Sequence, residues 1–340
     1  MSDGNGVRLG LTAVVVMVAG TVPRVATVRS CFAVPESHRR PDDPPVHRDA
    51  LPGAPFDAGR FRTLQEGMRA VAEGLTGLTL RYVEQLYTFG DRYRDPYELF
   101  GDGRSVVVGY LALVRDGPLG GGASWRDIYD CFPWEDWRDD RPAVIDGVIR
   151  PALDRWIRAA ADGGTRARRE ERAALAFALD GDTWDMERVL ERYELLYEAG
   201  LVVEAFRDRA LERRVVPAGD APPPPAEMPR ALGRPMARDG RRILATALER
   251  LRGKLKYRPI VFELLPPSFT LFQLQQVVEA LSGTRLHKQN FRRLIISGGL
   301  VEATGLFESQ TGGRPAELYR YRRAVIHERT SARAIPSAEG

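Results

Sequence analysis

The stretch Lys288-Gln-Asn-Phe-Arg-Arg-Leu-Ile-Ile-Ser297 predicts a helix whose two sides differ in chemistry. One side is apolar, because Phe291, Leu294 and Ile295 recur at helical spacing. The other side carries long cationic and amide side chains, which are residue types that contact DNA phosphates and base edges. The candidate DNA-binding residues of this helix are Lys288, Gln289, Asn290, Arg292 and Arg293.

The segments around this helix predict a winged helix-turn-helix domain over residues 257–323. Upstream, a short helix is expected over residues 257–265, and Thr270 is the expected N-cap of a second helix that ends at Gly283. Downstream, residues 300–304 and 316–321 predict the strands of a hairpin, with Arg314 in its turn as a further DNA contact. Three helices followed by a hairpin is the order of a winged helix, whose third helix is expected to enter the major groove.

Charge is distributed unevenly along the 340 residues. Between residues 251 and 323, 12 Lys and Arg face 5 acidic residues, a local net charge of +7, whereas the whole chain carries +4. A basic segment at one end of a mildly acidic chain indicates a polyanionic partner. A basic helix alone would equally fit a solvated surface. Together with the helix order and the hairpin, the charge favours double-stranded operator DNA.

The first half of the chain predicts a sheet covered by helices. A loop is expected over residues 35–55, and a helix over residues 60–75 that ends at Gly77. Strands are expected over residues 12–19, 25–34, 81–88 and 105–115. Strands and helices in this order are typical of a mixed α/β layer. Further helices are expected over residues 143–162, 165–179 and 185–199.

The chain therefore predicts two domains and the segments that join them. The first domain covers residues 8–204 and includes a helical insertion, and a Pro-rich linker follows over residues 205–238. A connecting helix with an apolar stripe is expected over residues 239–256. We expect this helix to pack on the first domain and to set the spacing of two winged helices in a dimer. The aromatic cluster of residues 125–137 is expected to lie in the core or at a dimer contact.

Composition argues against a membrane protein and against a metal site. The most apolar run covers nine residues, 11–19, whereas about 20 are needed to span a bilayer. Cys31 and Cys131 predict neither a disulfide framework nor a zinc site, and the four His show no metal-binding spacing. We expect a cytoplasmic protein with no membrane partner and no bound metal.

Residues 51–78 resemble a degenerate Nudix box. An intact box places three Glu at positions i, i+3 and i+4 of one helix, because a pyrophosphate-bound Mg²⁺ needs several oxygen ligands. Aligned on Arg69, those positions hold Ala70, Glu73 and Gly74. Aligned on Gly77, they hold no carboxylate, and Glu66 could substitute only weakly. We therefore expect no catalytic residues, with an active Nudix pyrophosphatase as the alternative.

The segment that follows is more specific. Residues 82–96, Tyr-Val-Glu-Gln-Leu-Tyr-Thr-Phe-Gly-Asp-Arg-Tyr-Arg-Asp-Pro, closely resemble the segment after the box in Nudix-related regulators of NAD metabolism of the NrtR and NadQ type. The basic segment resembles the same family in residues 252–257, 262–266 and 288–293. The aromatic residues 132–137 and the extra helices resemble the longer NadQ-type branch.

This resemblance implies a dimeric repressor of NAD biosynthesis or salvage genes. Its fold would be an α/β (α+β) Nudix-like domain with a helical extension, followed by the winged helix-turn-helix domain. The first domain would sense an adenine nucleotide such as NAD, ATP or ADP-ribose. A further hypothesis is that the Nudix-like domain serves only for dimerisation. The candidate effector-binding residues are Arg29, Glu73, Glu84, Gln85, Tyr87 and Thr88.

The candidate residues on the strand at 81–88 cannot all face one ligand. With a period of two, Glu84 and Thr88 face one side, and Gln85, Tyr87 and Phe89 face the other. Leu86 and Phe89 are expected in the core. Tyr87 could either stack on an adenine or pack against its neighbours.

Overall fold

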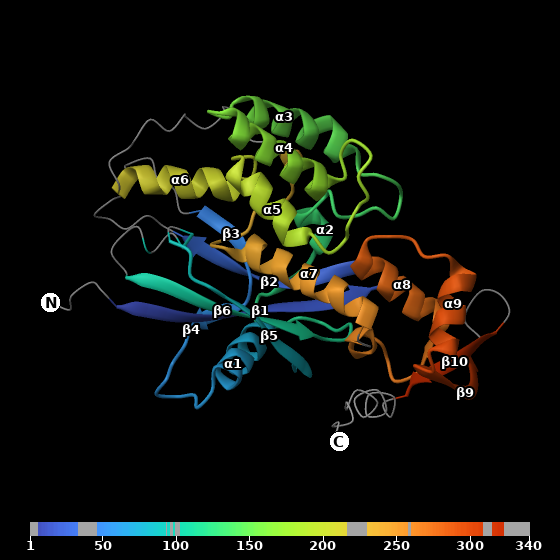
Figure 1. Ribbon diagram of the computed structural model, residues 1–340. Helices are drawn as coiled ribbons and strands as arrows, with labels where there is room; N and C mark the ends of the chain where they lie inside the picture. The colour runs from blue at the N-terminus through green and yellow to red at the C-terminus, as the bar shows by residue number, and fades with distance from the viewer. Residues whose placement is uncertain are drawn as a thin grey trace, which may run out of the picture.

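A seven-stranded sheet forms the centre of the molecule (Figure 1). The computed structural model describes residues 6–32, 46–92, 94–95, 98, 103–215, 230–257, 260–308 and 315–322. Five strands of the sheet run in the order β3-β2-β1-β6-β5, while β4 pairs with β1 and β7 pairs with β2. The strands are β1 (Val7–Ala19), β2 (Val22–Phe32), β3 (Val46–Ala50), β4 (Gly53–Pro55), β5 (Tyr82–Phe89), β6 (Arg104–Leu113) and β7 (Ser124–Asp127).

The long apolar strand β1 organises this sheet. It pairs antiparallel with β2, where Val16 lies opposite Val25, and parallel with β6 over ten residues. The strands expected over residues 12–19 and 25–34 are therefore confirmed. The expected loop over residues 35–55 is wrong at its end, because β3 pairs with β2 and β4 pairs with β1. Polar side chains of β3 line a pocket and are not part of the hydrophobic core. The strand therefore lacks the apolar residues by which a strand is predicted, and its composition resembles that of a loop.

One face of the sheet is covered by α1 (Leu64–Thr76). Thr63 caps its N-terminus by accepting a hydrogen bond from the Glu66 backbone N–H, and Gly77 ends it with a left-handed φ of 71°. Met68 and Ala72 of α1 are buried against apolar side chains of β1 and β6. The predicted helix and its glycine end are confirmed.

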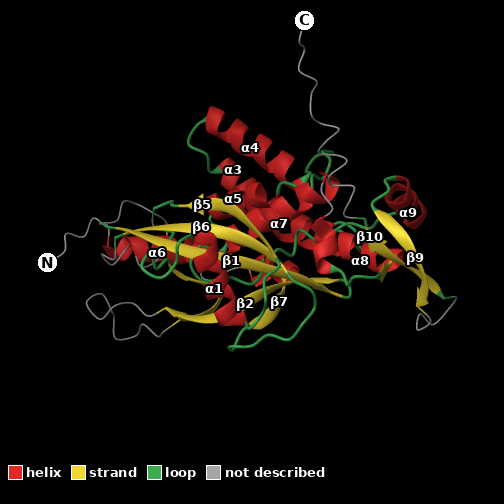
Figure 2. Ribbon diagram, turned by 90° about the horizontal axis from the view of Figure 1, so that it is seen from below, coloured by secondary structure: helices red, strands yellow, loops and turns green. Residues whose placement is uncertain are grey.

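The opposite face of the sheet is covered by a helical layer (Figures 1 and 2). The aromatic segment joins this layer, since Phe132 and Trp134 are fully buried, which confirms their expected place in the core. The layer contains α2 (Ile128–Cys131), η3 (Ile145–Ile149), α3 (Arg150–Arg158), α4 (Gly163–Phe177), α5 (Val189–Glu198), α6 (Val203–Val215) and α7 (Gly240–Tyr257).

The expected linker over residues 205–238 needs correction where the structure describes it. Helix α6 crosses the expected boundary at residue 204, and its Glu204 is buried with Arg241 of α7 at 3.1 Å. Near the other end, the short turn η4 (Arg230–Leu232) leads into buried Leu232 and Met236. The Pro222–Pro225 stretch lies outside the described residues. Single apolar residues such as Leu232 and Met236 show no helical or strand periodicity in the sequence. The composition of the segment therefore predicts a linker, although these residues are buried.

The predicted connecting helix is confirmed as α7. Its apolar stripe lies on the helical face of the sheet, with Leu244, Leu248 and Leu251 almost completely buried. At its C-terminal end α7 contacts α8 (Leu271–Ser282) of the next domain. The helix therefore packs on the first domain and reaches the second.

The last part of the chain forms the predicted winged helix. Thr270 and Gln273 form a reciprocal capping box at the start of α8, and Gly283 ends that helix. An added strand, β8, gives a three-stranded sheet in the order β8-β10-β9. The elements are η5 (Ile260–Leu264), β8 (Phe269–Thr270), α8 (Leu271–Ser282), α9 (Lys288–Ser297), β9 (Val301–Glu308) and β10 (Ala316–Tyr321).

The two domains share one hydrophobic core. Val14 and Leu111 of the central sheet belong to the same buried cluster as Leu248 of α7 and Leu274 and Phe291 of the winged helix. The winged helix is thus packed onto the first domain. No described helix is both long and apolar enough to cross a membrane.

Candidate functional site

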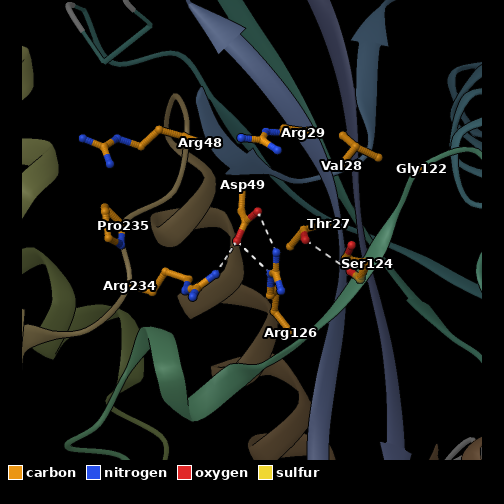
Figure 3. A pocket seen from close by; sticks show the side chains of 10 residues that line it. All are labelled: Thr27, Val28, Arg29, Arg48, Asp49, Gly122, Ser124, Arg126, Arg234 and Pro235. Atoms are coloured by element: carbon orange, nitrogen blue, oxygen red, sulfur yellow. Dashed lines mark hydrogen bonds and ion pairs between the residues drawn. The ribbon is translucent and has the colours of Figure 1, made fainter. Parts of the chain in front are cut away.

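A pocket of about 480 Å³ opens beside the β2–β3 edge of the sheet (Figure 3). Its walls come from β2, β3, β7 and the segment that precedes α7. Four arginines and one aspartate dominate the lining, so the site has a local excess of positive charge. The lining residues are Thr27, Val28, Arg29, Arg48, Asp49, Gly122, Ser124, Arg126, Arg234 and Pro235.

Strand register places these side chains together. Arg29 of β2 lies opposite Asp49 of β3, and Thr27 lies opposite Ser124 of β7. The Thr27 hydroxyl donates to the Ser124 carbonyl at 3.2 Å, which joins the two strands at the pocket wall. Arg234 is fixed from its backbone, since its N–H donates to the Asp130 carbonyl at 2.7 Å.

Asp49 neutralises only part of the positive charge. Its Oδ2 lies 2.9 Å from Arg126 Nε and 3.1 Å from Arg234 Nη1. Burial alone would raise the pKa of the Asp49 carboxyl, but its bonds to Arg126 and Arg234 outweigh burial and lower that pKa. Within the described part of the chain, Arg29 and Arg48 have no carboxylate within ion-pair distance. The pocket therefore suits an anion such as a diphosphate, which guanidinium groups bind through charge-assisted hydrogen bonds.

The pocket is connected to the start of α7. The Ala237 N–H donates to the Asp49 carbonyl at 2.8 Å, and the Met236 N–H donates to Glu204 Oε1 at 2.9 Å. Arg241, in the first turn of α7, is fully buried and donates to the carbonyls of Cys131 and Leu232, each at 2.9 Å. A displacement of Arg234 would thus act on the N-terminal end of the connecting helix.

The structure separates the predicted effector residues into three places. Arg29 lines the pocket, Glu73 lies on α1, and the other four lie on β5 at the opposite edge of the sheet. Gln85, Tyr87 and Thr88 are exposed there. Arg29 is therefore the one predicted effector residue that the pocket contains.

Glu84 has a structural role on the helical side of β5. Its carboxylate accepts from the Tyr82 hydroxyl at 2.5 Å, forms an ion pair with Lys254 and lies 3.2 Å from Arg250. Burial opposes ionisation, but the bonds from Lys254 and Tyr82 lower the pKa of Glu84. Glu84 thus fastens the sheet to α7.

The expected alternation along β5 is interrupted. A bulge lies between Gln85 and Thr88, because three residues of β5 span two residues of β6. As a result Leu86 and Phe89 point to the same core, and both are buried as expected. The ring of Tyr87 is 61% exposed and makes an edge contact with Phe89, so it is not buried packing.

The two carboxylates of the degenerate box hold backbone groups. Glu73 accepts the Leu80 N–H at 2.9 Å, and Glu66 accepts the Arg62 N–H at 3.2 Å. Over the described ranges, no three His, Cys, Asp or Glu residues form a group that could hold a metal ion. On α1, therefore, both carboxylates are occupied by loop contacts.

The basic face of α9 is exposed as predicted. All five candidate DNA-binding residues on the helix are exposed, and Arg293 donates to the Asn290 side chain at 2.8 Å. Phe291 anchors the helix and is 8% exposed, but Leu294 is 59% exposed and does not belong to the apolar side. Phe291 and Ile295 attach the helix to its domain, so the buried side of α9 is narrower than the apolar spacing predicts. Arg314 lies outside the described residues.

Two cations of the basic segment are not available to DNA, because Arg252 is fully buried and Lys254 pairs with Glu84. Arg320 is exposed, but it lies 2.5 Å from Glu302, which offsets its charge. The local charge therefore overstates the cationic surface, because sequence counting cannot see ion pairs. Within the described part of this segment, the exposed cations of α9, Lys288, Arg292 and Arg293, have no carboxylate within ion-pair distance.

Comparison with known proteins identifies the second domain. Residues 261–321 match the family model of the NrtR DNA-binding winged helix domain. A curated relative, the ADPR responsive transcriptional repressor NtrR of Acinetobacter baylyi, is 41% identical over 92 residues, which are 27% of this chain and 36% of the relative. The chain thus matches about a third of that relative's length.

One solved structure shares the overall fold. Shewanella oneidensis NrtR is 20% identical with a TM-score of 0.50, and the match covers 92% of this chain and 94% of that one. The same protein bound to a 27mer DNA is 21% identical with a TM-score of 0.48, covering 92% and 93%.

The fold and the winged helix match define a two-domain architecture. The molecule consists of an α/β domain with a helical extension and a C-terminal winged helix-turn-helix domain. Its C-terminal domain is similar to the DNA-binding winged helix domain of NrtR, and its overall fold is similar to that of Shewanella oneidensis NrtR.

Proposed function

We propose that this protein is a transcriptional repressor that binds operator DNA through α9 and releases or tightens that DNA in response to a nucleotide. The exposed basic face of α9 within the NrtR-type winged helix carries this proposal. Genes of NAD biosynthesis or salvage are the proposed targets, and a homodimer is the proposed assembly, because operators are commonly read as two half-sites.

The proposed effector is ADP-ribose, bound in the arginine pocket. The name of the Acinetobacter baylyi relative supports this nucleotide, and the charge of the pocket supports a diphosphate. Arg29 and Arg48 would take the diphosphate, since neither has a carboxylate partner within the described residues. NAD and ATP carry the same kind of group and are the competing effectors.

Arg234 is proposed to connect the effector to the DNA-binding domain. An anion in the pocket competes with Asp49 for Arg126 and Arg234, whose present partner is a single carboxylate. Because the Arg234 segment leads directly into α7, a new position of Arg234 would shift the start of that helix. The opposite end of α7 contacts α8, so the shift would reach the winged helix.

A pyrophosphatase is the competing function. The occupied carboxylates of Glu73 and Glu66 argue against it, because metal-assisted hydrolysis needs several free oxygen ligands. We therefore propose that the nucleotide is bound and not cleaved.

The test is a titration of full-length protein. ADP-ribose, NAD and ATP are compared in a thermal-shift assay, since a ligand that binds the folded state raises its apparent stability. DNA selected from a random pool by the protein is then titrated with and without the nucleotide that raises the melting temperature. A change in DNA affinity supports the proposal. Nucleotide binding without such a change would favour a dimerisation role, and nucleotide cleavage would favour the enzyme.

A further inference from the structure

Ile296 is an exposed aliphatic residue on the basic side of α9. Its side chain is 54% exposed. At about 100° per residue, Ile296 lies about 40° around the helix from Arg292 and about 60° from Arg293. It also follows Gln289 by seven residues, which is nearly two turns. Ile296 thus continues the stripe of Lys288, Gln289 and Arg292 toward the C-terminal end.

The core of the domain does not require Ile296. Phe291 is buried and Ile295 is half-buried, and these two side chains attach α9 to its domain. Leu294 is also exposed, but it lies about 160° around the helix from Ile296, away from Lys288 and Arg292. The two exposed aliphatic residues therefore differ in their position relative to the cations.

An aliphatic side chain on this stripe has a specific complement in DNA. The C5-methyl group of thymine is the one apolar group that the major groove presents, and apolar side chains contact it. Ile is β-branched, so its χ1 angle is restricted in a helix and its methyl groups are held in place before binding.

We propose that Ile296 is a specificity-determining residue that contacts a thymine methyl group in the major groove of the operator. This inference rests on the proposed binding of operator DNA by α9. The neighbouring Arg292 and Arg293 hold the helix against phosphates or guanine edges, and Ile296 adds discrimination in favour of thymine at the position it reaches.

The experiment is a double-mutant cycle between protein and DNA. Full-length wild type and the Ile296→Ala variant are each titrated with a selected operator duplex and with the same duplex in which deoxyuridine replaces every thymidine. Loss of one buried methyl contact is worth roughly a fourfold change in affinity. We expect uracil to weaken wild-type binding by at least this factor, and to weaken the Ile296→Ala variant by a smaller factor.

Leu294→Ala is the matched control. It removes an equally exposed aliphatic side chain from the same helix, and it should keep the full wild-type preference for thymine. Equal thymine preference in wild type and Ile296→Ala would overturn the inference, as would a wild-type protein that binds both duplexes equally. If the wild type selects no DNA sequence at all, the proposed function fails, and this inference fails with it.

Discussion

Glu135 and Arg252 form an ion pair in which both side chains are completely buried. Arg192 of α5 shares the same carboxylate, with its Nε 2.6 Å from Glu135 Oε1. Arg252 Nε also donates to the Leu281 carbonyl of α8 at 3.1 Å, and the nearby Tyr129 hydroxyl donates to the Ala280 carbonyl at 2.7 Å. This cluster therefore fastens the helical layer, α7 and the winged helix to one another.

Removing the charge of Glu135 should destabilise the whole protein. Glu135→Gln keeps the shape of the side chain but leaves two buried guanidinium groups without a counter-ion. We expect a loss of roughly 3–5 kcal/mol in the free energy of unfolding, measured by urea titration. Glu170→Gln, on the exposed side of α4, is the control and should change stability little. A loss no larger than that of the control would contradict the proposed role.

The contribution of Glu135 to the free energy of unfolding should decrease in acid. Burial opposes ionisation, but Arg192 and Arg252 lower the pKa of Glu135 below 4.5 in the folded protein. Its contribution is therefore fully present above pH 4.5 and is lost as the pH falls through the folded-state pKa. The stability difference between wild type and Glu135→Gln should be constant near neutral pH and shrink in acid. A difference that grows in acid would contradict this assignment.

Loss of a pocket arginine should weaken the binding of the nucleotide. Arg29→Gln removes a charge-assisted contact worth roughly 1.5–3 kcal/mol, which corresponds to about a 10- to 150-fold increase in the dissociation constant of ADP-ribose. Calorimetry on the full chain measures this change. Arg166→Gln on the exposed face of α4 removes the same charge far from the pocket and should leave affinity unchanged.

Arg234 should affect the coupling between nucleotide binding and DNA affinity more than Arg29 does. At saturating nucleotide, the wild-type DNA affinity is expected to change by roughly 5- to 150-fold. Arg234→Gln should reduce that change, because the connection from the pocket to α7 is cut. Arg29→Gln should retain the full change once the nucleotide is saturating. Equal coupling in the two variants would refute the path through Arg234.

Nucleotides should survive incubation with the protein and Mg²⁺. Glu66 and Glu73 are bound to backbone N–H groups, so ADP-ribose and NADH are expected to remain intact over hours. Chromatography of the nucleotides measures this directly. Turnover at about 1 s⁻¹ or faster, an ordinary enzymatic rate, would establish the pyrophosphatase instead.

DNA affinity should depend on the two exposed arginines of α9. Arg292→Ala or Arg293→Ala is expected to cost roughly 1–3 kcal/mol if the side chain contacts a base through two hydrogen bonds. If it contacts a phosphate, the loss should be similar on all sequences and the salt dependence should flatten by about one unit. If the variant that carries both substitutions kept its full DNA affinity, the DNA interface would have to lie outside α9.

Local periodicity was sufficient to predict the elements that carry their own signal. The winged helix follows from the stripe of α8, the cap at Thr270 and the two-sided chemistry of α9. Pairings between distant segments gave no such signal. Arg48, Asp49 and Arg126 meet because β3 and β7 both pair with β2, and Arg234 joins them through backbone hydrogen bonds of the segment before α7, so the pocket could not be predicted beyond Arg29.

The misassigned residues have a common physical cause. Glu84 is a predicted effector residue and Arg252 adds to the charge counted for the basic segment, but each forms an ion pair with a residue more than 100 positions away. The bulge in β5 likewise depends on its partner strand, and it reverses the sides on which Thr88 and Phe89 were expected. The charge of a residue and the alternation along a strand can be read from the local sequence. The role of the residue depends on the distant residue or strand that it contacts.

The hydrophobic cluster shared by the central sheet and the winged helix has a consequence for how such proteins can be recombined. A gene fusion that joined this winged helix to an unrelated sensor would remove the packing partners of Leu274 and its neighbours, and the Leu281 carbonyl would lose its hydrogen bond from Arg252. The winged helix therefore cannot be transferred to another protein without loss of stability. Changes in DNA specificity are more readily reached by substitutions on the outer surface of α9 than by exchange of the domain.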